Sequence, residues 1–203
     1  MSKKPVIVAM DLEGVLIPEI WIQVAEKTGI ASLRLTTRDI ADYDELMQHR
    51  LKILSRNKLT LPKIQRVINK MSPLPGAVAY LDWLRNRVQC LILSDTYYEF
   101  AAPLMKKLKF PILFCNSLQI QNNGQISNYF LRLKDGKRRT VAALKKLNFF
   151  VIAIGDSYND TTMLAEADRG ILFRPPLKVI REFPQYPVFT NYLALKNDLL
   201  KYV

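Results

Sequence analysis

Short runs of apolar, often β-branched residues recur along the chain and predict buried β-strands. The runs lie at Val6–Met10, Gln89–Leu93, Ile112–Cys115, Phe150–Ile154 and Gly170–Phe173. Near-continuous apolar runs of this length are typical of strands that are covered on both faces. We therefore expect a sheet that is mainly parallel.

Segments with helical periodicity separate most of these runs. Helices are predicted over Gly76–Arg87, Tyr97–Leu108, Arg139–Leu147 and Asp160–Ala167, with a last helix near Asn191–Leu200. Strands that alternate with helices favour an α/β fold, with a Rossmann-like parallel sheet and helices on both of its faces.

One long segment does not fit this alternation. It contains no strand-like run but three amphipathic helical patterns, at Ile20–Thr28, Tyr43–Leu54 and Pro62–Lys70. We interpret it as a helical cap over residues 18–72, inserted after the first strand. The core would then consist of residues 1–17 and 73–203.

Two smaller segments are also distinctive. Leu118–Leu133 contains Asn123-Gly124 between alternating residues, which predicts a β-hairpin as a second insertion. The segment that begins at Pro175 is rich in proline, and we expect it to run over the surface.

The composition is that of a globular protein with a strongly positive net charge. The 203 residues are 49% hydrophobic, and the formal net charge is +12. Basic residues are scattered, and no basic stripe is interleaved with aromatic residues, as binding to single-stranded nucleic acid requires. We therefore expect the charge to attract small anionic substrates rather than nucleic acid.

Neither a membrane segment nor a secretion signal is expected. No apolar run approaches the ~18 residues of a membrane span, and Asp11 interrupts the short run behind the N-terminal lysines. The two cysteines, Cys90 and Cys115, lie in apolar segments and are expected to be buried free thiols. These features predict a cytoplasmic protein without a membrane partner.

Three of the predicted strands are followed by polar residues. Asp11 and Glu13 follow the first strand, Ser94 and Asp95 the second, and the segment Asp156–Asp160 the fourth. In open α/β sheets, ligands bind beyond the carboxyl ends of the strands. The sequence therefore predicts one site at which these side chains meet.

The residue types in this site suit a phosphate group. Asp11 and Asp156 offer the hard oxygen ligands that Mg²⁺ prefers. Ser94 precedes a predicted helix, whose N-terminus attracts anions, and Lys137 near another helix start would add positive charge. Such groups stabilise a transferring phosphoryl group mainly by position and electrostatics.

The two acids of the first motif can then take different roles. Asp11, held ionised by a metal, can accept the phosphoryl group as an aspartyl-phosphate. Glu13 can protonate the leaving alcohol and then deprotonate the second acceptor. These roles require that the pKa values of the two carboxyl groups differ.

Four motifs in this order resemble those of the haloacid dehalogenase-like phosphatase superfamily. They are "DLEGV", "SDT", Lys137 and "GDSYND". The helical insert resembles the cap of the phosphoserine phosphatase branch, and the resemblance covers nearly the whole chain. It implies a Rossmann-like core, a covalent aspartyl-phosphate and a Mg²⁺ cofactor.

The resemblance assigns roles to the residues at the matching positions. Asp11 corresponds to the nucleophile and Glu13 to the general acid/base. The Mg²⁺ ion would be held by the Asp11 carboxylate, the main-chain carbonyl of Glu13 and Asp156, with Asp160 supporting these ligands.

The resemblance also implies the substrate. Ser94 and Lys137 correspond to phosphate-binding residues, and Asp95 and Asn159 lie beside the phosphate. Two cap residues correspond to those that hold the amino acid part of L-phosphoserine: Glu19 and Arg50. A carboxylate suits an α-ammonium group and a guanidinium suits an α-carboxylate.

Position 13 departs from the common pattern. Most phosphatases of the superfamily have aspartate where this chain has Glu13. A bifunctional subgroup of the phosphoserine phosphatase branch shares the glutamate and also transfers phosphate to homoserine. The resemblance therefore implies L-phosphoserine, and homoserine as a second possible partner, for a monomer or homodimer.

Each candidate residue also has a structural interpretation that the sequence leaves open. The acids that follow the strands could be solvated strand ends, helix caps or turn residues. Lys134 or Arg138 could take the place of Lys137. Arg50 could be an ordinary exposed residue of a cap helix, and Glu19 could be only an acid in the first turn of a helix. Trp21 and Trp83 fit apolar helix faces and are interpreted as core residues, and His49 is interpreted as a structural or surface residue and not as a ligand.

Two other functions remain open at this point. One is a phosphatase of the same fold that acts on a sugar phosphate or a nucleotide. The other is a basic protein that binds nucleic acid on an inactive phosphatase fold. The complete set of catalytic residue types favours the enzyme.

Overall fold

The computed structural model describes residues 4–36, 39–40 and 42–203. These residues form a sheet with the order β4-β3-β2-β1-β5-β6-β7. Every neighbouring pair is parallel except β3 and β4, which confirms the predicted α/β class. The strands are β1 (Val6–Met10), β2 (Gln89–Tyr97), β3 (Leu113–Ile120), β4 (Ile126–Phe130), β5 (Phe150–Gly155), β6 (Arg169–Phe173) and β7 (Val188–Phe189).

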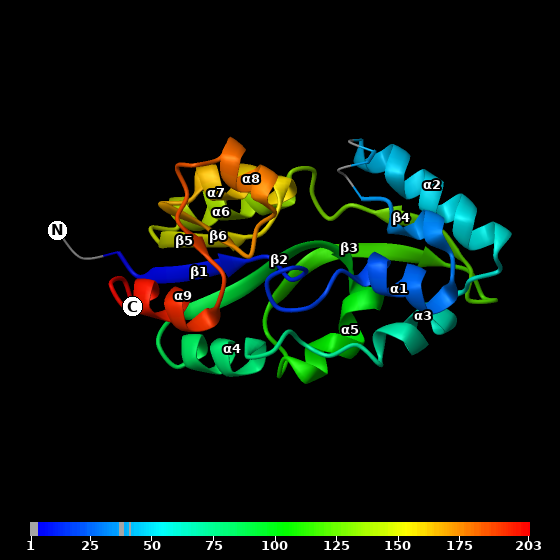
Figure 1. Cartoon of the computed structure of the whole chain (residues 1–203), viewed down its shortest axis with the longest axis horizontal. Helices are drawn as coiled ribbons and strands as arrows, with labels where there is room; N and C mark the ends of the chain where they lie inside the picture. Colours follow the sequence, from blue (N-terminus) through cyan, green and yellow to red (C-terminus); the bar gives the residue numbers. More distant parts are fainter. Residues whose placement is uncertain (1–3, 37–38, 41) are drawn as a thin grey trace.

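Helices cover both faces of the sheet (Figure 1). On one face lie α4 (Ala77–Arg85), α5 (Tyr98–Lys107) and α9 (Tyr192–Leu199). On the other lie α6 (Gly136–Lys146), α7 (Thr161–Glu166) and α8 (Leu177–Glu182). The doubly wound arrangement is therefore as predicted.

The alternation of side chains along β1 explains why its sequence is apolar throughout. Val8 and Met10 belong to the apolar cluster under α4 and α5, whereas Ile7 and Ala9 belong to the cluster under α6 and α7. Because successive residues of a strand point to opposite faces, a strand covered on both faces has no polar position.

The helical insert lies between β1 and α4 in the chain. It contains α1 (Ile20–Thr28), a short 3₁₀ helix (Ala31–Arg34), α2 (Tyr43–Arg56) and α3 (Leu61–Ile68). In Figure 1 these helices lie at the end of the molecule opposite to α9 and the C-terminus. The predicted helices of this segment are thus observed, with shifts at their ends.

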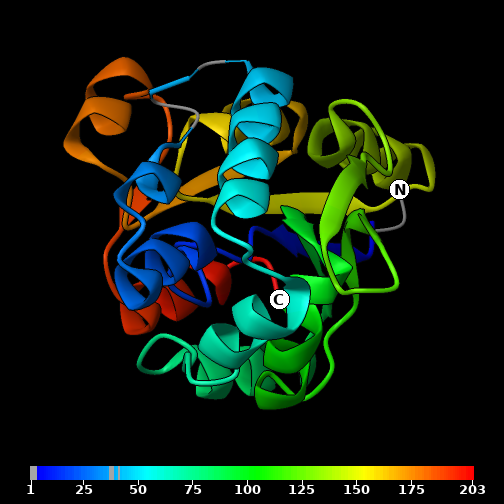
Figure 2. The same ribbon diagram turned by 90° about the vertical axis from the view of Figure 1, so that its right-hand side faces the viewer.

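The insert packs closely against the rest of the chain. Its buried side chains share one apolar cluster with β1 and α5. The N–H group of Leu61 donates to the carbonyl of Gly124, at the tip of the β3–β4 hairpin, over 2.9 Å, and α2 (cyan) stands over the end of the sheet (Figure 2). The predicted boundary between cap (18–72) and core stays a prediction, since no gap in the packing marks it.

The structure corrects the predicted ends of two strands. β2 continues to Tyr97, and β3 continues to Ile120 and folds back through the hairpin turn into β4. The hairpin predicted at Leu118–Leu133 therefore extends the main sheet and is not a separate insertion. Its turn is possible because Gly124 adopts a φ of +80°, a conformation that favours glycine.

Three further expectations need correction. The proline-rich segment after Pro175 contains α8 and β7, so it is not simply an irregular segment that runs over the surface. Cys90 and Cys115 are free, as predicted, but half-buried rather than buried. Trp83 is also half-buried, with the guanidinium of Arg87 over its ring.

No helix among the described residues has the length and apolar character that crossing a membrane would require.

The ion pairs of Asp198 connect α9 to β6 and should make stability depend on pH. Its carboxylate accepts hydrogen bonds from Arg169 and from Lys201. Burial alone would raise the pKa of Asp198, but these hydrogen bonds lower it below its usual value. A lowered folded-state pKa stabilises the protein above the unfolded pKa of about 4, and this contribution is lost as pH falls through the folded pKa.

We predict that Asp198→Asn lowers the free energy of unfolding by about 1–2 kcal/mol at pH 7, and that the difference shrinks below about pH 4. Urea unfolding at several pH values measures it. The exposed, loose pair Lys178–Glu182 provides the control, because Glu182→Gln should change stability by less than about 0.5 kcal/mol. Equal losses for Asp198→Asn at pH 3 and pH 7 would contradict the charge argument.

Candidate active site

A cavity of about 270 Å³ opens where the carboxyl ends of β1, β2 and β5 meet. The strand order reverses at this place, because β1 lies between β2 and β5, and such switch points are the usual ligand sites of open α/β sheets. The cavity is lined by most of the predicted site residues: Asp11, Glu13, Glu19, Arg50, Ser94, Asp95, Lys137, Asp156 and Asn159. Asp160, which is fully buried, lies directly behind them.

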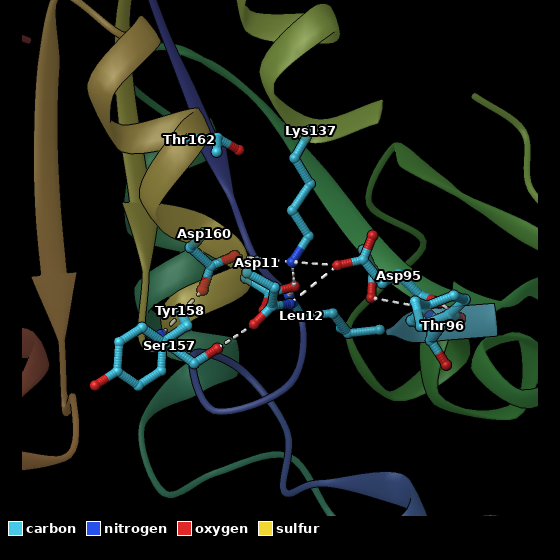
Figure 3. A network of polar contacts seen from close by, with 12 residues as sticks. Asp11, Leu12, Asp95, Thr96, Lys137, Ser157, Tyr158, Asp160 and Thr162 are labelled. Atoms are coloured by element: carbon cyan, nitrogen blue, oxygen red, sulfur yellow. Dashed lines mark hydrogen bonds and ion pairs between the residues drawn. The ribbon is translucent and has the colours of Figure 1, made fainter. Parts of the chain in front are cut away.

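Lys137 is the centre of the polar network. It lies in the first turn of α6, and its Nζ is 3.1 Å from Oδ1 of Asp11, 3.2 Å from Oδ2 of Asp95 and 2.8 Å from Oδ1 of Asp160. Figure 3 shows the side chain reaching from its helix toward the carboxylates. Burial alone would lower the pKa of Lys137, but the three acids raise it well above the usual value, so the lysine remains charged.

The structure decides between the basic residues near α6. Lys134 is exposed, and Arg138 forms ion pairs with Asp135 and Glu166 outside the cavity. Of these basic residues, Lys137 is the one in the cavity wall.

Negative charge is in excess beside this lysine. Carboxylate oxygens of Asp11, Asp156 and Asp160 lie within 4.8 Å of one another, and all three residues are buried. Burial and the repulsion from Asp160 raise the pKa of Asp11 well above its usual value and that of Asp156 to about 7. Close, buried carboxylates of this kind fit a metal ion, because a cation would relieve both effects.

Asp160 holds the turn that carries Asp156. Its Oδ2 accepts from the backbone N–H groups of Asp156 and Ser157 over 2.9 and 3.1 Å, while its Oδ1 faces Lys137. Ser157 and Asp160 also form a capping box on the short 3₁₀ helix Tyr158–Asp160. The cap interpretation of Asp160 is therefore confirmed, and the same carboxylate also positions the lysine.

The structure corrects the interpretation of Ser94. Because α5 begins only at Tyr98, Ser94 lies inside the irregular end of β2 and neither precedes a helix directly nor caps one. It is a cavity residue, but a helix N-terminus does not supply positive charge next to it. Asp95 beside it binds Lys137 and accepts from Nδ2 of Asn159 over 3.0 Å. Burial would raise the pKa of Asp95, but these two partners lower it.

Glu13 has a different environment from the other acids. Its Oε2 accepts from the backbone N–H of Ile20 over 2.8 Å, at the start of α1. Burial and the neighbouring Glu19 raise the pKa of Glu13 to about 8. Glu13 is therefore mainly protonated at neutral pH, unlike Asp95.

Arg50 and Glu19 bring opposite charges to the side of the cavity formed by the insert. Arg50 is only 6% exposed, which contradicts the surface interpretation. Its guanidinium lies over the ring of Trp21, 4.5 Å from the ring centroid, and donates to the carbonyl of Leu35 over 2.8 Å. Glu19 precedes α1 at its N-cap position, without a side-chain capping bond, and lines the cavity.

Comparison with known proteins identifies the family. A family model described as haloacid dehalogenase-like hydrolase matches residues 6–168. This chain belongs to the haloacid dehalogenase-like hydrolases. The membership predicted from the four motifs is thereby confirmed.

The relatives of this hydrolase support the predicted branch. Phosphoserine phosphatase ThrH of Pseudomonas aeruginosa is 57% identical over 195 residues, which cover 96% of this chain and 95% of the relative. A phosphoserine phosphatase of Pseudomonas syringae pv. tomato is also 57% identical over 195 residues, covering 96% of this chain and 82% of the relative.

A solved structure shows the same fold. A phosphoserine phosphatase in its apo form superposes with a TM-score of 0.78 at 20% identity, over 98% of this chain and 100% of that one. At this identity the similarity concerns the fold alone.

Several residues of the hydrolase's cavity wall were not predicted from the sequence, among them Trp21 and Tyr43. Trp21 was expected in the core, and its ring does pack against Phe100, but it also supports Arg50 in the cavity wall. Tyr43 donates to the main-chain carbonyl of Asp95 over 3.1 Å. Both contacts join segments that are far apart in the sequence, so no local pattern indicates them. His49 is half-buried and outside the cavity lining, as expected.

Gly14 is another wall residue that was not predicted from the sequence. Its φ is +75°, and a Cβ at this position would lie 2.4 Å from Cγ of Asp156. The glycine therefore lets the loop after β1 approach the acid of the loop after β5. The sequence did contain a signal for this role, because Gly14 is the glycine of the "DLEGV" motif.

We predict that Gly14→Ala lowers the free energy of unfolding by at least about 1 kcal/mol more than Gly29→Ala does, because only the added Cβ at position 14 meets a packed neighbour. Gly29 is the matched control because its φ is +71° but no atom lies within 4 Å of its added Cβ. Both variants carry the strain of a left-handed alanine, and only Gly14→Ala also displaces Asp156. Urea unfolding measures the stability of both variants. Equal losses of unfolding free energy would show that the contact with Asp156 does not destabilise the protein.

Proposed function

We propose that this hydrolase is a Mg²⁺-dependent phosphoserine phosphatase that forms an aspartyl-phosphate on Asp11. The observation that carries the proposal is the division of the cavity into two halves. Lys137 and the buried aspartates form one half, and Glu19 and Arg50 form the other. The names of the two relatives at 57% identity agree with it.

The first half suits a phosphoryl group. The ammonium group of Lys137, the hydroxyl of Ser94 and the amide of Asn159 are donors in the cavity wall, and phosphate oxygens accept from such groups. Asp11 would be the nucleophile, oriented by the N–H of Leu12, which donates to its Oδ1 over 2.7 Å.

The donor set fits the cofactor that the resemblance implies. Asp11, Asp156 and the main-chain carbonyl of Glu13 would hold Mg²⁺, with Asp160 fixing the turn of Asp156. A bound Mg²⁺ would keep the Asp11 carboxylate ionised and offset the negative charge of the phosphoryl group.

In the first step, an oxygen of Asp11 would attack phosphorus while the bond from phosphorus to the serine oxygen breaks. The proton of Glu13 would go to the serine oxygen, and serine leaves as an alcohol. A pKa of about 8 means that Glu13 holds this proton at neutral pH.

In the second step, Glu13 would act as the base. It takes a proton from water while the water oxygen attacks phosphorus. The bond from phosphorus to Asp11 breaks, which releases phosphate and restores the Asp11 carboxylate. Glu13 is then protonated again for the next substrate.

The second half of the cavity suits an α-amino acid. Glu19 can bind an ammonium group, and the Nε of Arg50 is buried without a hydrogen-bond partner among the described residues. This Nε can donate to a substrate carboxylate. A sugar phosphate or a nucleotide would leave the two charges unmatched, and such mismatches are strongly discriminating.

The same argument supports homoserine as a second acceptor. Homoserine carries the ammonium and carboxylate groups of serine and a hydroxyl on a side chain longer by one methylene. It could therefore bind Glu19 and Arg50 after serine leaves, with Glu13 taking the proton of its hydroxyl.

By contrast, a protein that only binds nucleic acid would gain nothing from a buried lysine among four acids, which is costly to desolvate.

We predict that Asp11→Asn lowers the rate of phosphate release from L-phosphoserine by at least about 10³-fold, because the nucleophile is lost. EDTA should abolish the activity of the unchanged protein, and added Mg²⁺ should restore it. Asp82→Asn, at an exposed ion pair far from the cavity, is the control and should keep normal activity. Full activity of Asp11→Asn would exclude the proposed intermediate.

We predict that Arg50→Met raises KM for L-phosphoserine at least about tenfold and lowers transfer to homoserine, because both ligands lose a carboxylate partner. Hydrolysis of p-nitrophenyl phosphate should change much less. Arg56→Met is the matched control, since Arg56 is an exposed residue of the same helix. A similar loss with both substrates would indicate that Arg50 has a structural role only.

A further inference from the structure

Large exposed apolar side chains gather beside the β3–β4 hairpin, outside the cavity of the active site. Tyr98 is 62% exposed, Phe130 53%, Leu131 45% and Phe114 38%. These four residues line one groove of about 350 Å³, which we call the apolar groove. Contiguous exposed apolar surface of this kind usually marks an interaction site.

The groove exists because helices cover only part of one sheet face. The cluster under α6, α7 and α8 contains side chains of β1, β2, β5 and β6, but none of β3 or β4. The register places Leu118 opposite Tyr129 and Ser117 opposite Phe130. Leu118 and Tyr129 pack into the apolar cluster on the side of the insert, so Phe130 points to the uncovered face.

The hairpin also supplies an open strand edge. Among the described residues, β4 pairs with β3 alone and forms one margin of the sheet. The sequence of β4, ISNYF, contains neither a charged residue nor a proline. Charged residues and proline are the features that usually prevent an edge strand from pairing with another chain. The nearby Arg132 is engaged, since it lies over the ring of Phe114 and donates to Thr140.

We propose that the apolar groove and the edge of β4 form the interface between two copies of this chain. An edge strand can pair antiparallel with the same strand of a second copy about a two-fold axis, and such an interface is self-complementary. Strand pairing would satisfy the outward backbone groups of β4, and Phe130 and Leu131 would enter the groove region of the other copy.

The area of the groove agrees with this occupant. With roughly 200 Å² for each large side chain, the exposed fractions of the four groove residues correspond to about 400 Å² of apolar surface. A stable interface buries about 800 Å² per partner, of which somewhat more than half is apolar. The groove therefore supplies most of the apolar part of a dimer interface.

The charge of the chain points to the same face. Two copies with a net charge of +12 each repel one another over most of their surfaces. An uncharged strand allows close approach, and Arg132, the basic residue that lines the groove, is engaged by Phe114 and Thr140 of its own copy.

Light scattering after gel filtration tests the proposal. The unchanged protein should have twice the chain mass of 23.4 kDa. Phe130→Asp should raise the dissociation constant at least about 30-fold, as expected at a central apolar contact, and shift the mass toward that of one chain. Leu193→Asp is the control, because Leu193 is 70% exposed on α9, at the opposite end of the molecule (Figure 1).

A second variant and a second measurement guard against misfolding. Tyr98→Lys should have the same effect as Phe130→Asp, with thermal unfolding and circular dichroism like those of the control. Hydrogen exchange of the amides of residues 126–130 should be faster in both variants than in the unchanged dimer. All cavity residues come from one copy, so phosphatase activity should remain, which keeps this test separate from that of the proposed function.

Three results would overturn the proposal. One is a monomeric unchanged protein at tens of micromolar, which would leave the groove to a different protein. Another is a dimer that persists in both groove variants, and the third is an equal loss of dimer in Leu193→Asp.

Discussion

The ammonium group of Lys137 holds together segments that are far apart in the sequence. It binds Asp11 after β1, Asp95 in β2 and Asp160 before α7. A buried charge is tolerated only when it is paired, and removal of one partner leaves the others uncompensated. The first turn of α6 and the ends of β1, β2 and β5 must therefore keep their relative positions. The excess of acid around one lysine also makes the place suitable for a cation.

The cavity holds its acids in different environments. Burial and the neighbouring Glu19 raise the pKa of Glu13, whereas Lys137 and Asn159 outweigh burial at Asp95 and lower its pKa. Carboxyl groups whose pKa values are pushed apart can serve as acid and as anion in one reaction. The insert contributes the amino acid half through Arg50, which Trp21 and the carbonyl of Leu35 hold in place.

The β3–β4 hairpin links the active site to the outer surface. Tyr129 faces inward and donates to Asp44 at the start of α2, which ties the hairpin to the insert. Phe130, the next residue, faces outward into the apolar groove. Because successive strand residues point to opposite faces, one short strand can support the cavity wall and present an interaction surface. Contacts between two copies would therefore be made without any residue of the cavity.

The sequence by itself determined the α/β class, the helical insert and the strand-end motifs. These features depend on local patterns: apolar runs mark strands buried on both faces, and strand ends place Asp11 and Asp156 at one edge of the sheet. The tertiary structure alone decided which lysine enters the site, that Arg50 is buried and that Ser94 lies four residues before α5. It also revealed Tyr43 in the cavity wall and the apolar groove. These features depend on contacts between residues that are distant in the chain. Packing determines their burial and the charges of their partners, and neither leaves a periodic pattern in the sequence.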